Sequence, residues 1–402
     1  MGGDDRRTSL SSMEQTNKKP KLGAVSGVYI PVCLNIFSIL MFLRFGWILG
    51  QVGLLGMLGL LVTAYVVDFL TTLSLSAIAS NGEVKGGGAY YVSRPEFGGS
   101  IGVLFYLAQV LNTALNVVGL IDCIKLNVGE SFPQGYWTVF VLQTLALLLC
   151  AGLCLAGSGI FAKASNALLV ILTLAIVSIP VSAAFKSPFH DNELGVRFTG
   201  FSVETLVDNF APHTKSESYK GLETFREVFA ILFPATSGIF AGASMSGDLH
   251  NPSKDIPKGT LWAMMTTFIA YLVVVFSMAA TTTHASFLNN TNIISVTSLS
   301  MPLILAGECA VTFFSAVMGL VGAAKLMQAL ARDKLLPGLL PFSRGTKRND
   351  EPVQAILLTY ALAQVAMFAN LNQIATLISM GYQVNCHFPL WSWTIEKLTR
   401  IR

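Results

Sequence analysis

The sequence predicts an all-α protein that crosses a membrane many times. Of its 402 residues, 53% are hydrophobic and only 12% are charged, whereas soluble domains are about 25% charged. The mean hydropathy is +0.61, and apolar runs of bilayer-spanning length recur along the chain. Membrane lipid is therefore an expected partner. No nucleic acid is expected, because basic residues at a cytoplasmic membrane face account for the net charge of +4.

Residues 1–23 are polar and charged, and we expect them to form a disordered cytosolic N-terminus. A transmembrane transport domain of about ten spans is expected over residues 24–388, with an incomplete last span, and a short atypical tail over 389–402. The expected spans are 24–50, 52–80, 100–128, 136–157, 164–185, a broken sixth span within 225–260, 261–282, 301–330, 352–370, and a tenth that begins near Gln373.

Charge in the connectors predicts the orientation of these spans. Basic residues before the first span and in the connectors that follow even-numbered spans place the N-terminus and those connectors in the cytoplasm. These connector residues are Lys85, Arg94, Lys254, Lys258, Arg332, Lys334, Arg344, Lys347 and Arg348. The connector over 283–300 then lies outside, where the pattern Asn289-Asn290-Thr291 is a glycosylation acceptor.

Two of the spans contain interruptions. In the sixth, Pro234, Gly238 and several hydroxyl side chains break an apolar run. In the first, Asn35 and Ser38 place polar groups near the bilayer midplane, a few residues after a proline. Either interruption alone is also consistent with a kinked helix or an interhelical hydrogen bond. Breaks in the first and sixth spans together match an inverted repeat of five helices, in which broken helices build the substrate site.

Enzyme chemistry finds no support in the sequence. The five histidines are scattered without metal-ligand spacing, so no transition-metal site is expected. The run Gly86–Gly88 lacks the lysine of a phosphate-binding loop. Five of the six cysteines lie in apolar spans, which is typical of small buried side chains rather than of disulfides. We expect no enzymatic activity and no cofactor.

Several long motifs resemble the cation–chloride cotransporter family. They are LNIFSILMFLRFGWILGQ (34–51), SAIASNGEVKGGGAYY (76–91), EFGGSIG (96–102), FPATSGIFAGASMSGDLHNPSKDIPKGT (233–260) and KLMQALARDKLLP (325–337). Within the family the chain is most similar to the fungal vacuolar members and to the cotransporter-interacting-protein branch. The resemblance implies the leucine-transporter-type (amino acid–polyamine–organocation) fold, a five-plus-five inverted repeat with broken first and sixth helices. It also implies two further helices and a cytosolic C-terminal domain, for which we expect no counterpart within residues 1–402.

The resemblance also implies where ions bind. One chloride would meet the amides of Gly238, Ile239 and Phe240 together with Tyr382, and a second the amides of Ser38, Ile39 and Leu40. Backbone amides at the start of a half-helix suit an anion. Potassium would meet carbonyls of Asn35, Ile36 and Pro234 and the Ser237 hydroxyl, because such oxygens replace the water around a cation. Arg44 and Asp122 match an outer gate, with an ordinary structural salt bridge as the alternative.

Three positions depart from the family pattern. Asn116 stands where the family has a potassium-site tyrosine, and Phe314-Ser315 stands where sodium-coupled members have paired serines, which argues against a sodium site. The loop over 90–96 is a few residues shorter than in the family.

The expected function is a symporter that couples K+ to Cl− by alternating access, in the vacuolar membrane or the plasma membrane. Two alternatives stay open: a non-transporting regulatory partner of another cotransporter, and an amino-acid or polyamine permease. Homodimers or association with another cotransporter are compatible with either of the cotransporter hypotheses.

Overall fold

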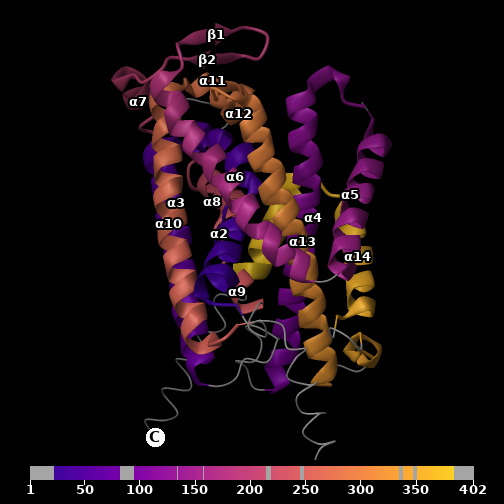
Figure 1. Ribbon diagram of the computed structural model, residues 1–402. Coiled ribbons are helices and arrows are strands. Elements are labelled where there is room, and N and C mark those ends of the chain that lie inside the picture. The colour runs from indigo at the N-terminus through magenta and orange to yellow at the C-terminus, as the bar shows by residue number, and fades with distance from the viewer. Residues whose placement is uncertain are drawn as a thin grey trace, which may run out of the picture.

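The computed structural model describes residues 22–81, 95–133, 135–156, 158–213, 219–244, 249–334, 338–346 and 351–383. Within these ranges the chain is a bundle of long helices with a short β-hairpin at one end (Figure 1). In the described part of the chain, seven helical segments are long and apolar enough to cross a membrane. The all-α membrane architecture is thus confirmed. The predicted N-terminal disorder, the short loop and the C-terminal tail lie outside the described ranges.

Long helices make up most of the bundle. They are α3 (Ile39–Asn81), α4 (Pro95–Val128), α5 (Tyr136–Ala156), α6 (Ser158–Phe185), α10 (Pro252–Thr281) and α13 (Met301–Arg332), followed by the shorter α14 (Val353–Ala366) and a helical run over 371–383. The most extensive packing joins α13 to α4 and α6, and α3 to α10. On α5, α6 and α10 many large apolar side chains, among them Leu148, Leu174 and Ile269, are exposed. Such faces suit contact with lipid.

Three helices extend beyond the start of their predicted spans. The span starts expected near Ser100 and Ala164 agree with apolar segments that begin at Gly102 and Ala164, although α4 and α6 themselves begin several residues earlier. The start expected near Leu261 is wrong, because the segment and α10 both begin at Pro252. Hydropathy marks where a segment becomes apolar, whereas helical hydrogen bonding continues through polar turns at the membrane surface. In α10 these turns carry Lys254 and Lys258, and Pro252 begins the helix, where its missing N–H costs no bond.

The first two predicted spans are joined through α3, which is kinked at Gly53 (φ 68°, ψ 176°). A side chain at Gly53 would lie within 3 Å of the backbone of Ala211 and Pro212. Just beyond the kink, the Leu54 amide donates to the Asn209 carbonyl (2.8 Å). The loop after α7 (Val203–Asp208) therefore holds the turn between the two spans.

The polar segment between α6 and α8 is a folded cap rather than a plain loop. It contains β1 (Phe189–Asp191) and β2 (Val196–Phe198), which pair antiparallel. In Figure 1 this hairpin lies at the same end as α11 (His284–Asn289) and α12 (Ile293–Thr297). The Lys186 ammonium joins the two connectors by donating to the Val296 and Ser298 carbonyls, both at 2.8 Å. Burial among these groups lowers the pKa of Lys186.

The opposite end of the bundle holds the start of α10 and the end of α13 (Figure 1). Lys254 and Lys258 lie in the first turns of α10, and Arg332 lies in the last turn of α13. Basic residues therefore gather opposite the hairpin. This arrangement agrees with a cytoplasmic assignment for that end.

Candidate functional site

The sixth span is broken in the structure over four residues. Helix α8 (Leu222–Leu232) passes into a 3-10 turn, η4 (Phe233–Ala235), and helix α9 (Phe240–Ser244) starts only after Thr236–Ile239. Pro234 cannot donate a helical hydrogen bond, which favours the end of α8 here. The Thr236 hydroxyl donates to the Phe233 carbonyl (3.0 Å), and the Ser237 hydroxyl donates to the Pro234 carbonyl (3.1 Å). Side chains of the break thus satisfy carbonyls that the helix leaves open.

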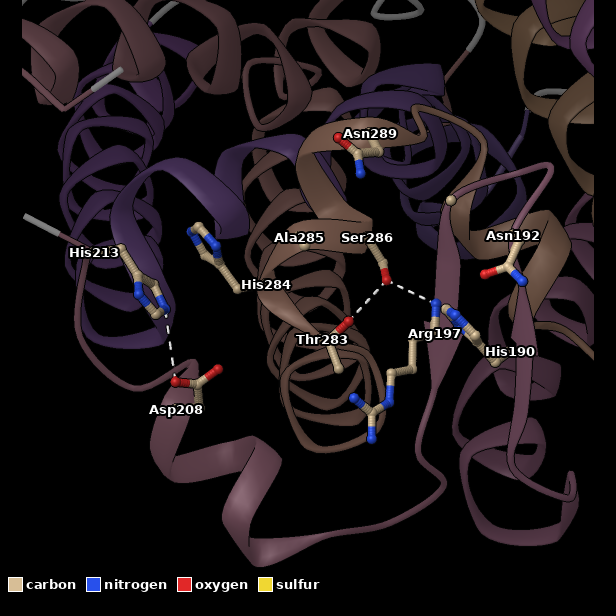
Figure 2. A pocket seen from close by; sticks show the side chains of 11 residues that line it. His190, Asn192, Arg197, Asp208, His213, Thr283, His284, Ala285, Ser286 and Asn289 are labelled. Carbon is tan, nitrogen blue, oxygen red and sulfur yellow. Dashed lines mark hydrogen bonds and ion pairs between the residues drawn. The ribbon is translucent and has the colours of Figure 1, made fainter. Parts of the chain in front are cut away.

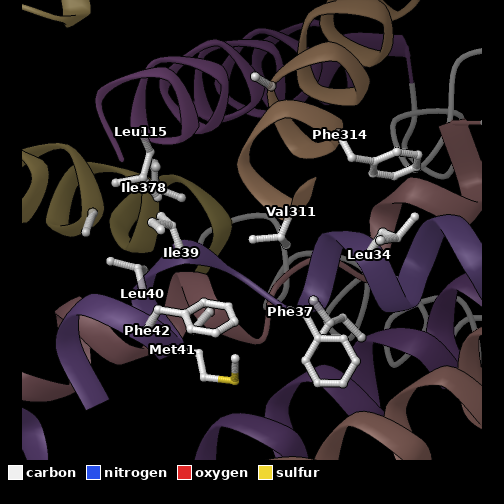
Figure 3. Close-up of a cluster of buried hydrophobic side chains, with 14 of the residues drawn as sticks. Leu34, Phe37, Ile39, Leu40, Met41, Phe42, Leu115, Val311, Phe314 and Ile378 are labelled. Atoms are coloured by element: carbon white, nitrogen blue, oxygen red, sulfur yellow. The ribbon is translucent and has the colours of Figure 1, made fainter. Parts of the chain in front are cut away.

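The first span is also broken, over a shorter stretch. Helix α2 (Ile30–Ile36) ends where Phe37 turns to an extended conformation (ψ 96°), and α3 begins after Ser38. Apolar side chains from three other segments surround this break (Figure 3). They include Leu115 of α4, Val311 and Phe314 of α13, and Ile378. The break is therefore closed off from lipid, as irregular backbone at membrane depth requires.

The two breaks meet at Gly238. A Cβ atom built on this residue would lie within 2.5 Å of the Asn35 carbonyl oxygen and of the Ile36 nitrogen. Only glycine allows the two backbones to approach this closely. The predicted pairing of the first and sixth spans is thus a direct backbone contact. Residues that are about 200 positions apart in the chain form one site.

Tyr271 of α10 ties the same two breaks together. Its hydroxyl donates to the Ile36 carbonyl (2.7 Å) and lies 2.9 Å from the Ala235 carbonyl, and its side chain is fully buried. Sequence reasoning missed this residue, although a tyrosine in the middle of an apolar span was a signal. Ser315 of α13 adds a bond to the Leu34 carbonyl (3.2 Å).

Backbone donors without acceptors lie at the sixth-span break. Within the described part of the chain, the amides of Gly238 and Ile239 donate to no protein group, and both residues are buried. The Ser38 amide at the first break is directed at the Tyr271 hydroxyl oxygen instead. Buried amides without a partner are rare in proteins. The Leu40 amide is different, because it donates to the Ser38 hydroxyl (3.3 Å). Two of the predicted chloride-site amides, those of Gly238 and Ile239, are therefore available to an anion.

Tyr382 lies beside Phe240, one of the predicted chloride ligands. Its ring stacks on Phe240 with centroids 5.8 Å apart, and Phe105 of α4 packs against both rings. The tyrosine is almost completely buried. The helical run over 371–383 therefore closes the site on the side of α9.

Oxygen atoms without donors also lie near the breaks. The side-chain oxygens of Asn35 and Asn116 are buried and have no hydrogen-bond partner. Asn116 uses its amide group within α4, where it donates to the Asn112 carbonyl (2.8 Å). One turn later, Gly119 packs against Ile39. Asn116 is thus on the part of α4 that faces the first break, with an oxygen available to a cation.

The proposed outer gate is not closed in this structure. Arg44 donates from Nε to the Asn372 side-chain oxygen (2.7 Å) and from its terminal group to the Leu43 carbonyl (3.0 Å). No ion pair within 4 Å joins Arg44 to Asp122, both of which the structure describes. The gate thus stays a prediction.

Two buried carboxylates were not predicted as functional residues from the sequence. Asp68 of α3 is fully buried, and neither of its oxygens has a partner. Glu308 of α13 is also fully buried, but it accepts a hydrogen bond from Asn127 (3.1 Å). Both residues interrupt apolar spans in the sequence, and ionisable groups in such spans mark functional positions by default.

A polar pocket of about 560 Å³ lies in the cap, away from the breaks (Figure 2). His213 and His284 stack there with centroids 3.8 Å apart, and Asp208 lies 3.9 Å from His213. His284 also bonds the Gly50 carbonyl (2.8 Å). Burial, followed by the neighbouring His213, lowers the pKa of His284. The predicted acceptor Asn289 lines this pocket with its side chain exposed, but the pocket contains none of the predicted ion ligands.

Comparisons with known proteins identify the family. The model of the amino acid permease family matches residues 27–400. The chain is 45% identical, over 90% of its length, to vacuolar cation-chloride cotransporter 1 of Saccharomyces cerevisiae, and covers 34% of that protein. It is 44% identical, over 95% of its length, to an uncharacterized transporter of Schizosaccharomyces pombe, and covers 38% of it.

An animal relative is more distant. Solute carrier family 12 member 9 of Danio rerio is 36% identical over 94% of the chain, which covers 46% of that protein. The chain thus spans less than half the length of each of these relatives. Taken with the broken helices, these matches show that the chain belongs to the amino acid permease family of membrane transporters, and its resemblance to the cation–chloride cotransporters is confirmed.

Proposed function

We propose that this chain is the transport domain of a symporter that moves chloride with a monovalent cation, K+, by alternating access. The observation that carries the proposal is the pair of buried backbone amides at the sixth-span break, Gly238 and Ile239, which donate to no described group. An anion that accepted these bonds would remove the cost of leaving them unmade. Relatives named as cation–chloride cotransporters support chloride as that anion.

The cation half of the proposal is supported by acceptors instead of donors. Asn35 and Asn116 each offer a buried side-chain oxygen without a partner. The Ile36 and Pro234 carbonyls already accept one hydroxyl each, from Tyr271 and Ser237, but a carbonyl oxygen has a second lone pair. Carbonyl, amide and hydroxyl oxygens together suit a hard monovalent cation.

The deciding experiment is uptake of rubidium and chloride by the purified protein in lipid vesicles. We expect rubidium uptake that requires chloride, and we expect Tyr382→Phe to abolish it. Tyr106→Phe is a matched control, because Tyr106 is also a buried tyrosine, with its hydroxyl 3.2 Å from Thr359. No uptake, together with co-purification of a second transporter, would instead identify a regulatory partner. Uptake of amino acids would identify a permease.

Arg44 and Asp122 would close the outer side of the site in another conformation. An exposed ion pair is worth about 0–1 kcal/mol, which is small enough for repeated opening. Single charge reversals, Arg44→Asp and Asp122→Arg, should each abolish uptake, and the double exchange should restore part of it. Absence of rescue would leave Arg44 with the structural role that its bond to Asn372 shows.

The vacuolar membrane is the proposed location, because the Saccharomyces cerevisiae relative is named as a vacuolar protein. The cap that carries Asn289 would then face the vacuolar lumen. Glycan attachment at Asn289 tests this orientation, since Asn289→Gln should remove a mass shift that glycosidase also removes.

A further inference from the structure

Asp68 of α3 is the most unusual polar group in the bundle. Its side chain is 0% exposed, and both carboxylate oxygens lack a hydrogen-bond partner. Transfer of an ionised carboxylate out of water without a partner is very unfavourable, so such a group binds a cation or a proton. Glu308, the comparable buried carboxylate of α13, has the Asn127 amide as a donor. The donor nearest to Asp68 is the Thr236 hydroxyl, which donates to the Phe233 carbonyl instead.

The position of Asp68 connects it to the sixth-span break. It lies near Thr236, the first residue of the break, and within electrostatic range of the hydroxyls of Tyr65 and Tyr271. Tyr271 is the residue whose hydroxyl contacts carbonyls of both breaks. A change of charge on Asp68 therefore alters the electrostatic potential at the contact that joins the two broken helices.

The surrounding hydroxyls favour a proton over a metal cation. Thr236 donates to the Phe233 carbonyl, Tyr65 donates to Thr267, and Tyr271 donates to the Ile36 carbonyl. A hard cation needs several oxygen ligands besides the carboxylate, and these hydroxyls already serve other partners. A proton needs a single carboxylate oxygen. The titratable groups near Asp68 are Tyr65 and Tyr271, and Cys33 of α2 lies near Tyr65. No described basic side chain contributes to the electrostatics of Asp68.

We propose that Asp68 is a proton-binding site that is occupied in this conformation and emptied when the broken helices rearrange. A proton taken from water converts the carboxylate to a neutral carboxylic acid, which suits the dry environment seen here. Its release would leave a negative charge, which requires water or a cation and so favours a more open arrangement of α3 and the sixth span. Protons would then be exchanged during the transport cycle.

Infrared spectroscopy of the detergent-purified protein tests proton binding without any transport. We expect a carbonyl stretch from a buried carboxylic acid that Asp68→Asn removes and Glu308→Gln leaves in place. A band that Asp68→Asn leaves unchanged would overturn the proposal. So would a carboxylate signal from Asp68 that responds to added potassium, because it would show a metal cation at this position. If the Asp68→Asn variant does not fold, Asp68→Glu replaces it in this test, because it keeps a carboxylic acid at this position and should shift the band without removing it.

Proton exchange is tested in vesicles that contain a pH-sensitive dye, and this arm alone rests on the proposed function. A rubidium chloride gradient should change the internal pH with the wild-type protein and with Glu308→Gln, but not with Asp68→Asn. An unchanged internal pH with a wild-type protein that takes up rubidium would overturn the exchange. If the infrared band were present but the protein took up no rubidium, the proton site at Asp68 would stand and the proposed symporter function would be wrong.

Discussion

The first and sixth spans are broken at the same depth but for different reasons. The sixth break has Pro234 and Gly238 in its sequence and extends over four residues outside helices. The first break has no proline or glycine within it, since Pro31 lies at the start of α2 and the break follows at Phe37 and Ser38. The sixth break is therefore explained largely by its own residues. The other depends on groups supplied by α10 and α13 through Tyr271 and Ser315.

This difference suggests a division of roles. The sixth span can unwind locally, because its own threonine and serine satisfy its open carbonyls. The first span relies on its neighbours, so any movement of α10 or α13 changes its hydrogen bonding. Substitutions at the contact between the breaks should therefore affect both spans, whereas those at Ser315 should affect only the first.

The largest effect is expected from Gly238→Ala, because the new methyl group would collide with the backbone of Asn35 and Ile36. Overpacking of this kind costs about 1–3 kcal/mol in unfolding free energy. The colliding atoms here belong to the backbone, which cannot move aside as a flexible side chain can. We expect a lower thermal-unfolding midpoint and loss of chloride-dependent rubidium uptake. Gly152→Ala on α5 is the control, since nothing lies within 4 Å of its added methyl group. Wild-type behaviour of Gly238→Ala would show that the breaks do not touch.

Tyr271→Phe should have the next largest effect. It keeps the ring contacts with Phe37 and Phe45 but removes the hydroxyl from the Ile36 and Ala235 carbonyls. Leaving buried carbonyls unsatisfied costs about 1–3 kcal/mol. Tyr65→Phe should cost less, because it breaks a single bond to Thr267. Equal losses of unfolding free energy in the two variants would argue against a special role for Tyr271.

Ser315→Ala should have a smaller effect that is confined to the first span. It removes one hydrogen bond to the Leu34 carbonyl, worth about 0.5–1.5 kcal/mol. Hydrogen exchange measured by mass spectrometry should rise in peptides that cover α2 and stay unchanged in peptides that cover α8. A rise in both would show that the two breaks open together.

The smallest effect is expected on the pH dependence of stability, through His284 in the cap, which contacts the first span. The pKa of His284 is below its ordinary value, chiefly through burial, so the folded state favours the neutral ring. Its contribution to stability is present above the ordinary value of about 6.5 and is lost as the pH falls through the lowered pKa. The thermal-unfolding midpoint should therefore decrease toward pH 5, and His284→Gln should flatten that decrease. The effect reaches the first span through the bond to the Gly50 carbonyl.

The sequence alone determined the membrane architecture, the position of both breaks and the family. Long apolar runs must form spans, because lipid offers no partners to the backbone, and Pro234 and Gly238 mark a break for local reasons. Motif resemblance also located Tyr382 beside the sixth break, where its ring stacks on Phe240.

Only the tertiary structure showed how the breaks are held and which polar groups remain without partners. Tyr271, Asp68 and Ser315 lie far along the chain from Phe37 and Ser38, and no local pattern reveals that their side chains meet the breaks. A hydrogen bond between distant residues depends on how helices pack, and so does the absence of one. The carboxylate of Asp68 thus became a candidate ion-binding group only once the fold was known. The amides of Gly238 and Ile239 were already expected to bind chloride, and the fold added that they donate to no described group.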